Sequence, residues 1–220
     1  MKNVPYASAV GSLMYAMMCT RPDICFVVGM VRRYQSNPGL THWKAMKRIL
    51  RYLKGTGHYS LCYEGNDLQM RGYTDADWER DIDERKSTSG FVFLLNKGAI
   101  TWSSKKQSCI ALSTMEAEYM AFSAAVQEAV WLNRFLSSLR VVGNTSDRAL
   151  IYSNNEAAIA YSKDPKFHCM TKHIDIKYNY VMDKVARKEV SMEYISTHDM
   201  VADPFTKPIP RDAFVKLLVI

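Results

Sequence analysis

Residues 73–78 read Y-T-D-A-D-W and place Asp75 inside an apolar, strand-like run. Asp75 has strand spacing with Tyr73 and Asp77, so the three side chains share one face of the expected strand. A carboxylate within an apolar strand costs free energy unless it is paired with a cation or bound to a metal. The stretch therefore indicates either a metal site or an acid with a counter-charge.

Two lysines could supply the counter-charge of Asp75. An edge-strand acid facing solvent could form salt bridges with Lys105 and Lys106, which close a later strand of the same sheet. Both readings of Asp75 remain open at this point.

The pattern around this stretch predicts an α/β domain with a mixed sheet. A strand over residues 68–78 is followed by strands at 91–95 and 99–104 around the turn Asn96-Lys97-Gly98. The elements after them are helix 113–139, strand 149–153, helix 156–162, helix 173–186, strand 190–196 and a short helical tail. This order gives an antiparallel meander first and parallel crossovers after it.

The N-terminal part reads as three helices, at residues 6–19, 22–35 and 41–54. The third helix is two-sided, with apolar residues on one face and a row of basic residues on the other. The basic residues are Lys44, Lys47, Arg48, Arg51 and Lys54. This row is either a solvated outer face or a surface that contacts phosphates.

Charge is unevenly distributed along the chain. The net charge is +7, and residues 1–68 hold nine Lys or Arg and three Asp or Glu, hence +6. The rest of the chain contributes only +1 (7 − 6). A polyanionic partner is therefore favoured, chiefly by the N-terminal part.

The cysteines and the hydropathy pattern exclude several classes. The five cysteines are scattered and contain no C-x-x-C pair, which argues against a disulfide framework and a zinc cluster. They fit a reducing, intracellular compartment, either cytoplasm or nucleus. No signal peptide is evident, and the apolar run at 12–19 is interrupted at 20–23, so no membrane association is expected.

Two glutamates begin the long helix, where residues 113–119 read S-T-M-E-A-E-Y. Ser113 and Glu116 form an S-x-x-E capping box, which is a sufficient structural role for Glu116. Glu118 has no such role and lies beside small residues that let a helix approach a sheet closely. Glu118 is thus either a site residue or an ordinary exposed glutamate.

Two further stretches complete the set of motifs. Residues 201–208 read V-A-D-P-F-T-K-P and place Asp203 near the C-terminus. Residues 151–156 read I-Y-S-N-N-E and carry Asn154 at a strand end that could present a fourth acid. Acids gathered from distant strands and helices are how proteins build a two-metal phosphodiester site.

Many ordered motifs of the chain resemble one family. The strings G-Y-T-D-A-D-W, R-K-S-T-S-G-F-V-F, W-S-S-K-K-Q, A-L-S-T-M-E-A-E-Y, T-K-H-I-D-I and V-A-D-P-F-T-K-P occur in this order. They resemble the ribonuclease H domain of copia-type LTR-retrotransposon Pol polyproteins. Upstream, Y-A-S-A-V-G-S-L-M-Y, C-T-R-P-D-I and L-R-Y-L-K-G-T resemble the end of the preceding reverse transcriptase.

The resemblance implies a domain plan. Residues 1–66 would be a helical, thumb- or connection-like end of the reverse transcriptase, 67–210 a ribonuclease H-like domain and 211–220 a tail. The implied fold is a mixed five-stranded sheet flanked by helices. Nothing upstream supplies the paired-Asp hairpin of a polymerase, so either a C-terminal piece of a Pol polyprotein or a degenerate genomic copy translated from an internal Met is expected. Its partners would then be an RNA–DNA hybrid and the missing polymerase subdomains.

The resemblance also implies cleavage of the RNA strand of the hybrid with two Mg²⁺ ions, or Mn²⁺, about 3.5–4 Å apart. Asp75 would bridge the metals, Glu118 would be the helix ligand and Asp203 the C-terminal acid. Asn154 stands where the family has a fourth Asp. Asn offers one neutral oxygen, and Mg²⁺ prefers anionic oxygens, so weaker metal binding and slower cleavage are expected. Glu156 is a conceivable substitute ligand.

The remaining candidates carry weaker signals. His198, just ahead of Asp203, resembles the mobile His that related enzymes use in product release, although a loop His is otherwise simply solvated. His173 lacks a partner at metal-ligand spacing. Contacts to the hybrid backbone are expected from Lys44, Lys47, Arg48, Arg51, Lys105, Lys106 and Asn155. Turn and cap roles are the alternative for the last three.

Three readings of the function remain open from the sequence. The chain is an active ribonuclease H, a non-catalytic hybrid-binding relic of that enzyme, or a folded remnant without function. The residue at position 154 separates the first reading from the other two.

Overall fold

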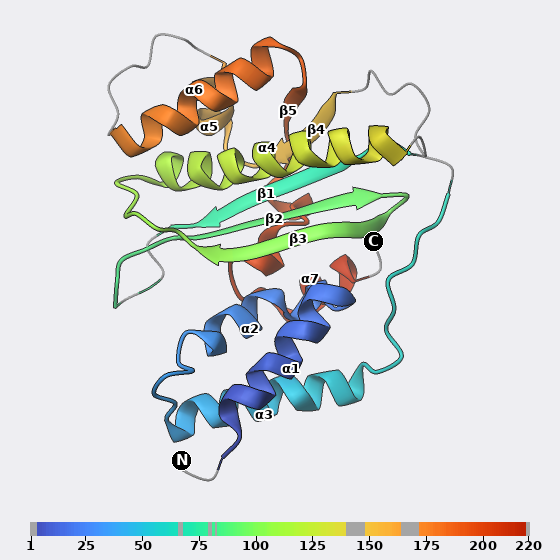
Figure 1. Ribbon diagram of the computed structural model, residues 1–220, viewed down its shortest axis with the longest axis vertical. Coiled ribbons are helices and arrows are strands. Elements are labelled where there is room, and N and C mark those ends of the chain that lie inside the picture. Colours follow the sequence, from blue (N-terminus) through green and yellow to red (C-terminus); the bar gives the residue numbers. More distant parts are fainter. Residues whose placement is uncertain are drawn as a thin grey trace. The chain divides into compact units, whose positions relative to one another are not determined.

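The computed structural model describes residues 4–65, 68–78, 81, 83–139, 148–163 and 172–218, with side chains from residue 176 onward in the last range. The chain divides into two compact units, Met1–Cys62 and Tyr63–Ile220 (Figure 1). Each unit has its own cluster of buried apolar side chains.

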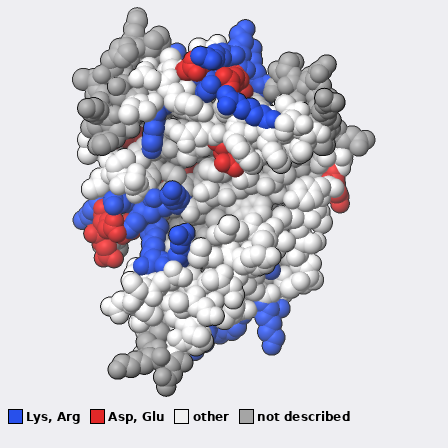
Figure 2. All heavy atoms as spheres, in the orientation of Figure 1, with Lys and Arg blue, Asp and Glu red and all other residues white. Residues whose placement is uncertain are grey.

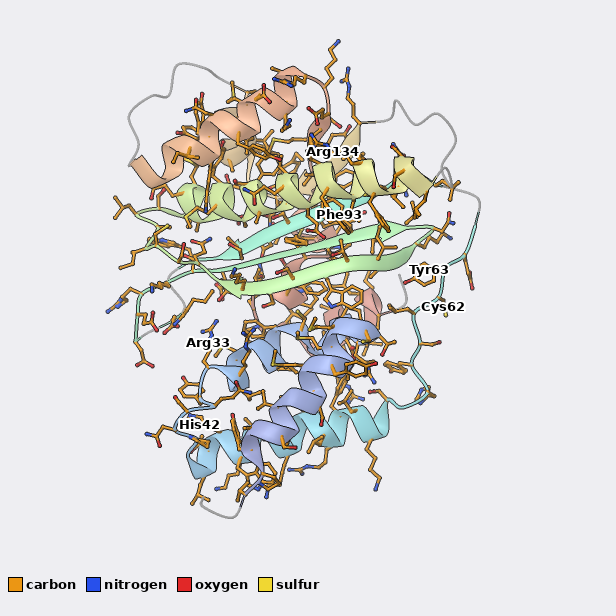
Figure 3. All side chains as sticks on the ribbon, viewed as in Figure 1. Arg33, His42, Cys62, Tyr63, Phe93 and Arg134 are labelled. Carbon is orange, nitrogen blue, oxygen red and sulfur yellow. The ribbon has the colours of Figure 1, made fainter. Side chains whose placement is uncertain are left out.

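This division precedes the boundary expected after residue 66. The hydroxyl of Tyr63 donates to the carbonyl of Ala99 at 2.9 Å (Figure 3), and the N–H of Glu64 donates to the carbonyl of Asn96 at 2.9 Å. These two bonds attach residues 63 and 64 to the second unit.

The first unit consists of helices. They are α1 (Tyr6–Cys19), the 3₁₀ turn η1 (Pro22–Ile24), α2 (Cys25–Arg32) and α3 (Leu40–Gly55). The expected helix over 22–35 is therefore shorter and begins as a 3₁₀ turn, with Pro22 at its first position. The buried apolar residues of the unit are Tyr6, Val10, Leu13, Ile24, Val28, Val31, Met46 and Ile49.

A cluster of hydrogen-bonded polar side chains joins η1 to the end of α3. The guanidinium of Arg21 donates to both carboxylate oxygens of Asp23, at 2.9 and 2.7 Å, and to the hydroxyl of Thr56 at 2.7 Å. The hydroxyl of Tyr52 donates to Asp23 at 2.7 Å. We call Arg21, Asp23, Tyr52 and Thr56 the Asp23 cluster. Every charge in it has a partner.

The second unit is built on a five-stranded sheet in the order β3-β2-β1-β4-β5. The strands are β1 (Arg71–Asp77), β2 (Thr88–Leu95), β3 (Gly98–Lys106), β4 (Ala149–Ser153) and β5 (Val190–Tyr194). The first three pair antiparallel, whereas β4 runs parallel to β1 and β5 parallel to β4. The mixed sheet predicted from the sequence, a meander followed by parallel crossovers, is confirmed.

Three helices cover one face of this sheet (Figure 1): α4 (Thr114–Leu139), α5 (Glu156–Tyr161) and α6 (Lys172–Ala186). Phe93 of β2 (Figure 3) lies in the core with Tyr119 and Phe122 of α4. The neighbouring strand makes room for this ring with Gly72, because a Cβ there would lie 2.5 Å from Phe93. The core thus fixes α4 against β1, which carries Asp75.

The C-terminal segment packs on the other side of β2. It contains the 3₁₀ turns η2 (Thr197–Asp199) and η3 (Asp203–Phe205) and the helix α7 (Arg211–Leu217). A Cβ on Gly90 of β2 would lie 2.7 Å from Cβ of Phe205 and 2.7 Å from Cγ2 of Thr206. Because Gly90 is the register partner of Asp75, the absence of its side chain lets η3 approach Asp75.

Neither a disulfide bond nor a membrane-spanning helix occurs in the described part of the chain. The four cysteines within it, Cys19, Cys25, Cys62 and Cys109, form no disulfide bond. None of the helices it contains has both the length and the apolar character needed to cross a bilayer.

Candidate metal centre and nucleic-acid contacts

Asp75 lies in the central strand β1 and is only 1% exposed. Its Oδ2 accepts a hydrogen bond from the hydroxyl of Thr206, which is fully buried. The ammonium group of Lys207 lies 3.5 Å from the same oxygen. The side chain of Asp75 therefore contacts the segment that follows η3. Thr206 in this segment is 131 residues from Asp75 in the sequence.

The alternative that a lysine of β3 supplies the counter-charge of Asp75 is wrong. The ammonium of Lys106 lies 2.9 Å from Oδ2 of Asp81 and 2.6 Å from Oε1 of Glu84. Lys106 is thus paired with acids of the charged turn between β1 and β2, and Lys105 is exposed. The cation next to Asp75 comes from the C-terminal segment instead.

The start of α4 confirms the structural role of Glu116. The N–H of Glu116 donates to the hydroxyl of Ser113 at 3.2 Å, as a capping box requires. The carboxylate of Glu116 in turn accepts from the N–H of Leu112 at 2.7 Å, one residue before the expected position. Both bonds occupy helix-end groups, so Glu116 is committed to the cap.

Glu118 has the same exposure as Glu116, 8%, but a different environment. The backbone N–H of Ala76 donates to its carboxyl group, while its buried Oε2 has no hydrogen-bond partner. Burial, followed by the charge of Asp75, raises the pKa of Glu118 to about 9. The alternative of an ordinary exposed glutamate is therefore wrong.

Asp203 begins η3 and brings a third carboxylate to this place. Its Oδ1 lies 2.9 Å from the ammonium of Lys207. Burial raises the pKa of Asp203, and the nearby charge of Asp75 adds to this, against the effect of Lys207. Burial alone would lower the pKa of Lys207, but the attraction of Asp75 and Asp203 outweighs it and raises that pKa. Asp75, Glu118, Asp203 and Lys207 form what we call the Asp75 cluster.

Asn154 follows the last residue of β4 and is half-buried. The parallel register pairs Tyr73 of β1 with Tyr152 of β4, whose rings stack with centroids 5.1 Å apart. Two residues further along each strand are Asp75 and Asn154, so the register directs Asn154 to the same end of the sheet.

The residues after Asn154 have local roles. The side-chain oxygen of Asn155 accepts from the N–H of Ala158 at 2.9 Å and caps α5. Glu156 is exposed in the first turn of that helix. The cap accounts for the carbonyl oxygen of Asn155, and a contact between its amide group and nucleic acid stays a prediction.

The donor set of the Asp75 cluster fits a hard divalent cation in its chemistry. Carboxylate oxygens are the ligands that Mg²⁺ prefers, and the unpartnered Oε2 of Glu118 is a buried acceptor without a donor. As the side chains stand, no three acidic, His or Cys side chains among the described residues are close enough to hold an ion. The cation that contacts both Asp75 and Asp203 is the ammonium of Lys207.

Two histidines of the sequence have no described contact with these carboxylates. His198 lies in η2 with an exposed side chain, and its Nδ1 is 3.2 Å from Oδ1 of Asp199. The side chain of His173 lies outside the described residues. A role of His198 in product release stays a prediction.

Sequence reasoning missed Thr206 and Lys207. A signal was present, because Lys207 lies four residues after Asp203, the spacing at which opposite charges often pair on a helical turn. The contact of both residues with Asp75 depends on how the segment packs against β2. That contact has no local signature.

The predicted nucleic-acid contacts on α3 belong to the first unit. All five basic side chains of that helix are exposed, and Met46 and Ile49 on its other side are buried. The two-sided character predicted for this helix is thus observed. Figure 2 shows Lys and Arg side chains in several separate groups on the face drawn. A phosphate-binding role for α3 stays a prediction.

Comparison with known proteins places the chain among mobile-element proteins. No family model matches it. It is 49% identical over 214 residues to the retrovirus-related Pol polyprotein from transposon TNT 1-94 of Nicotiana tabacum, which covers 97% of this chain and 16% of the polyprotein. The secreted RxLR effector protein 161 of Plasmopara viticola is 53% identical over 133 residues, 60% of this chain and 94% of that protein.

Among solved structures, LC11-RNase H1 in complex with an RNA/DNA hybrid matches 68% of this chain and 99% of its own, with a TM-score of 0.42 and 17% identity. The chain spans only 16% of the tobacco polyprotein. Sequence identity along nearly the whole chain, together with the mixed five-stranded sheet, settles its family. The chain belongs to the family of retrovirus-related Pol polyproteins of transposons.

Proposed function

We propose that the second unit binds RNA–DNA hybrids and hydrolyses their RNA strand with divalent cations, and that Asn154 weakens this activity. The convergence of Asp75, Glu118 and Asp203 from β1, α4 and η3 carries the proposal. Three carboxyl groups buried together are unfavourable without a strong counter-charge, and the pKa of Glu118, about 9, expresses that cost.

Asp75, Glu118 and Asp203 would hold two Mg²⁺ or Mn²⁺ ions, which when bound supply an activated water and stabilise the leaving oxygen. The residues themselves contribute placement. The strand fixes Asp75, the capped start of α4 fixes Glu118, and the close contact of η3 with Gly90 fixes Asp203. Glu118 must release its proton before its oxygens can act as anionic ligands, so metal binding is linked to deprotonation.

Asn154 is the reason to expect impaired activity. It directly follows β4, and the parallel pairing of β4 with β1 places it at the same end of the sheet as Asp75. Its amide presents one neutral oxygen, where a carboxylate would present two charged ones. Asn and Asp have nearly the same shape, so the fold tolerates the change while the site loses negative charge.

The basic face of α3 supports a second part of the proposal, which is backbone contact with the hybrid. Exposed Lys and Arg side chains at helical spacing neutralise phosphates without reading sequence. The missing polymerase subdomains of a Pol polyprotein would be the other partner of this unit.

A cleavage assay on an RNA–DNA hybrid with Mg²⁺ or Mn²⁺ tests the catalytic part. The unmodified chain, Asn154→Asp, and the double variant Asn154→Asp/Asp75→Asn are compared, with the exposed Asp83→Asn as a matched control. We expect Asn154→Asp to cut on the order of tenfold or more faster than the unmodified chain, as for an added catalytic charge. The double variant should be inactive and the control unchanged.

Equal rates for the unmodified chain and Asn154→Asp would show that Asn154 is not limiting. No cutting by either protein would favour the non-catalytic reading, which a gel-shift titration of the hybrid at rising salt then tests. Binding through phosphates must weaken steeply with salt. Replacing Lys44, Lys47, Arg48 and Arg51 with Gln should reduce both the affinity and its salt dependence. As a control, Lys163→Gln at an exposed position should change the affinity and its salt dependence only by the small amount expected for the loss of one charge.

A further inference from the structure

Lys207 occupies an unusual place for a lysine. Its ammonium group lies 2.9 Å from Oδ1 of Asp203 and 3.5 Å from Oδ2 of Asp75, and its side chain is 27% exposed. It thus contacts two of the three carboxyl groups that the proposed function assigns to metal binding. A single positive charge serves both.

We propose that Lys207 is the resident counter-cation of the Asp75 cluster, and that a divalent ion must displace its ammonium group in order to bind. This inference rests on the proposed function, because it concerns the same carboxylates. It assigns Lys207 a role as a positioning residue that keeps the acids together and competes with the metal for them.

The residues before Lys207 are anchored, so its side chain can move while the backbone stays in place. Thr206 is fully buried, its hydroxyl donates to Asp75, and the hydroxyl oxygen lies 3.1 Å from the carbonyl oxygen of Asp203 in the same turn. Phe205 is also buried, packed against Gly90. The backbone beside Lys207 is therefore held, whereas a lysine has a flexible four-carbon stem that can carry its charge away.

The charges explain why such a cation is needed. Asp75 and Asp203 are both shielded from water, and two carboxylates that share a site repel each other. An ammonium group between them offsets that repulsion with one positive charge, and Mg²⁺ would do so with two. The divalent ion is the stronger partner, but it must first overcome the attraction that holds Lys207.

The alternative is an ordinary stabilising salt bridge, and it predicts a different result. Removal of such a bridge would destabilise the protein and leave the affinity for metal unchanged or lower. Removal of a competing cation destabilises the metal-free protein and raises its affinity for metal. Stability and affinity measured on the same variant therefore separate the two.

The experiment uses the full chain with Mn²⁺ as the probe, and binding is measured by electron paramagnetic resonance and by calorimetry. Lys207→Met removes the charge but keeps the length of the side chain, Lys207→Arg keeps the charge, and the exposed Lys163→Met controls for net charge. We expect Lys207→Met to bind Mn²⁺ on the order of tenfold more tightly. Its metal-free melting temperature should fall, and Mn²⁺ should raise it by more than in the unmodified chain. The other two variants should bind like the unmodified chain.

A second measurement needs no variant at Lys207. Amine-reactive labelling of the unmodified chain, followed by mass spectrometry, should show several-fold faster labelling of Lys207 when Mn²⁺ is present, with Lys163 unchanged. If Mn²⁺ binds Lys207→Met no more tightly than it binds the unmodified chain, and leaves the labelling of Lys207 unaltered, the role of Lys207 as a counter-cation is overturned. The metal site itself then stands. Absence of Mn²⁺ binding to both proteins at millimolar concentrations overturns the counter-cation and the proposed function together.

Discussion

Each unit of the chain contains a cluster of buried or half-buried charged side chains, and the two clusters differ in how their charges are matched. In the Asp23 cluster, one carboxylate meets one guanidinium in a two-pronged contact, and Tyr52 and Thr56 fill the remaining positions. In the Asp75 cluster, one ammonium contacts two of the three carboxyl groups, and Oε2 of Glu118 has no hydrogen-bond partner. The first cluster is complete, and the second has an excess of acid.

The difference shows which cluster is structural and which is a candidate site. A matched cluster stabilises its fold and needs nothing else, whereas an unmatched one costs stability that a ligand can restore. Burial alone does not distinguish them, since Asp23 and Asp75 are both almost inaccessible, with side chains 5% and 2% exposed. The balance of charge does.

The largest effect expected is on the matched cluster. Asp23→Ala leaves the guanidinium of Arg21, which is 11% exposed, without its carboxylate and should cost about 3–5 kcal/mol of unfolding free energy. Hydrogen exchange measured by mass spectrometry should show loss of protection in α1, α2 and α3. As a control, Asp183→Ala removes the exposed partner of Arg187 and should cost under about 1 kcal/mol. Equal costs for the two substitutions would contradict the structural role of the Asp23 cluster.

In the Asp75 cluster, by contrast, removing the charge of one acid is expected to stabilise the protein. The folded protein keeps a proton on Glu118 up to a pKa of about 9, while the unfolded chain releases it near the ordinary value of 4.5. The metal-free protein therefore loses stability as the pH rises between these values. Glu118→Gln removes this loss, so it should stabilise the protein by on the order of 2 kcal/mol at pH 7.5 and by almost nothing at pH 4.5.

Urea unfolding of both proteins across this pH range, in the presence of EDTA, checks the expectation. A stabilisation that does not depend on pH would show that the gain comes from packing rather than from the proton on Glu118.

A smaller effect is expected where the C-terminal segment meets the sheet. Gly90→Ala places a methyl group 2.7 Å from Phe205 and Thr206, so η3 must shift, at a cost of about 1–2 kcal/mol. Because Asp203 and Lys207 flank these residues, Mn²⁺ binding should change along with stability. Gly11→Ala in α1, where the added carbon has no neighbour within 4 Å apart from adjacent residues and the backbone of its own helix, is the control and should be neutral or stabilising. If Gly90→Ala left Mn²⁺ binding unchanged, the position of η3 would not determine metal binding.

The smallest effect is expected at the neighbouring glutamate. Glu116→Ala removes the acceptor for the N–H of Leu112 and should cost about 1 kcal/mol through the helix cap. Mn²⁺ affinity should stay the same. Calorimetric melting and Mn²⁺ titration check both points. Altered metal binding in Glu116→Ala would remove the distinction between the two glutamates of α4.

Local patterns were sufficient to predict most elements. The first helix was predicted over residues 6–19, where the structure has α1, and the S-x-x-E pattern predicted the cap at Glu116. The start of β2 was predicted at Phe91 but lies at Thr88. Ser89 and Gly90 have little strand propensity of their own, and their pairing with Ala76 and Asp75 of β1 keeps them extended.

The acids of the candidate site were predictable one by one, but their counter-charge was not. Asp75, Glu118 and Asp203 each stand out within a short motif, whereas Lys207 lies in a segment without periodicity. Its contact with Asp75 spans 132 residues. Lys105 and Lys106 were the nearer choice in sequence, but the ion pairs of Lys106 with Asp81 and Glu84 took precedence. Such competition between partners is decided by packing.

That span of 132 residues between Asp75 and Lys207 also has a consequence for synthesis. The ribosome delivers β1 and the start of α4 long before the segment that carries Asp203, Thr206 and Lys207. During that interval the nascent domain holds Asp75 without its ammonium partner, so the sheet cannot close around this carboxylate at full stability. Messages that stop before this segment would yield proteins with an uncompensated acidic centre, which degradation would remove in preference to the complete product.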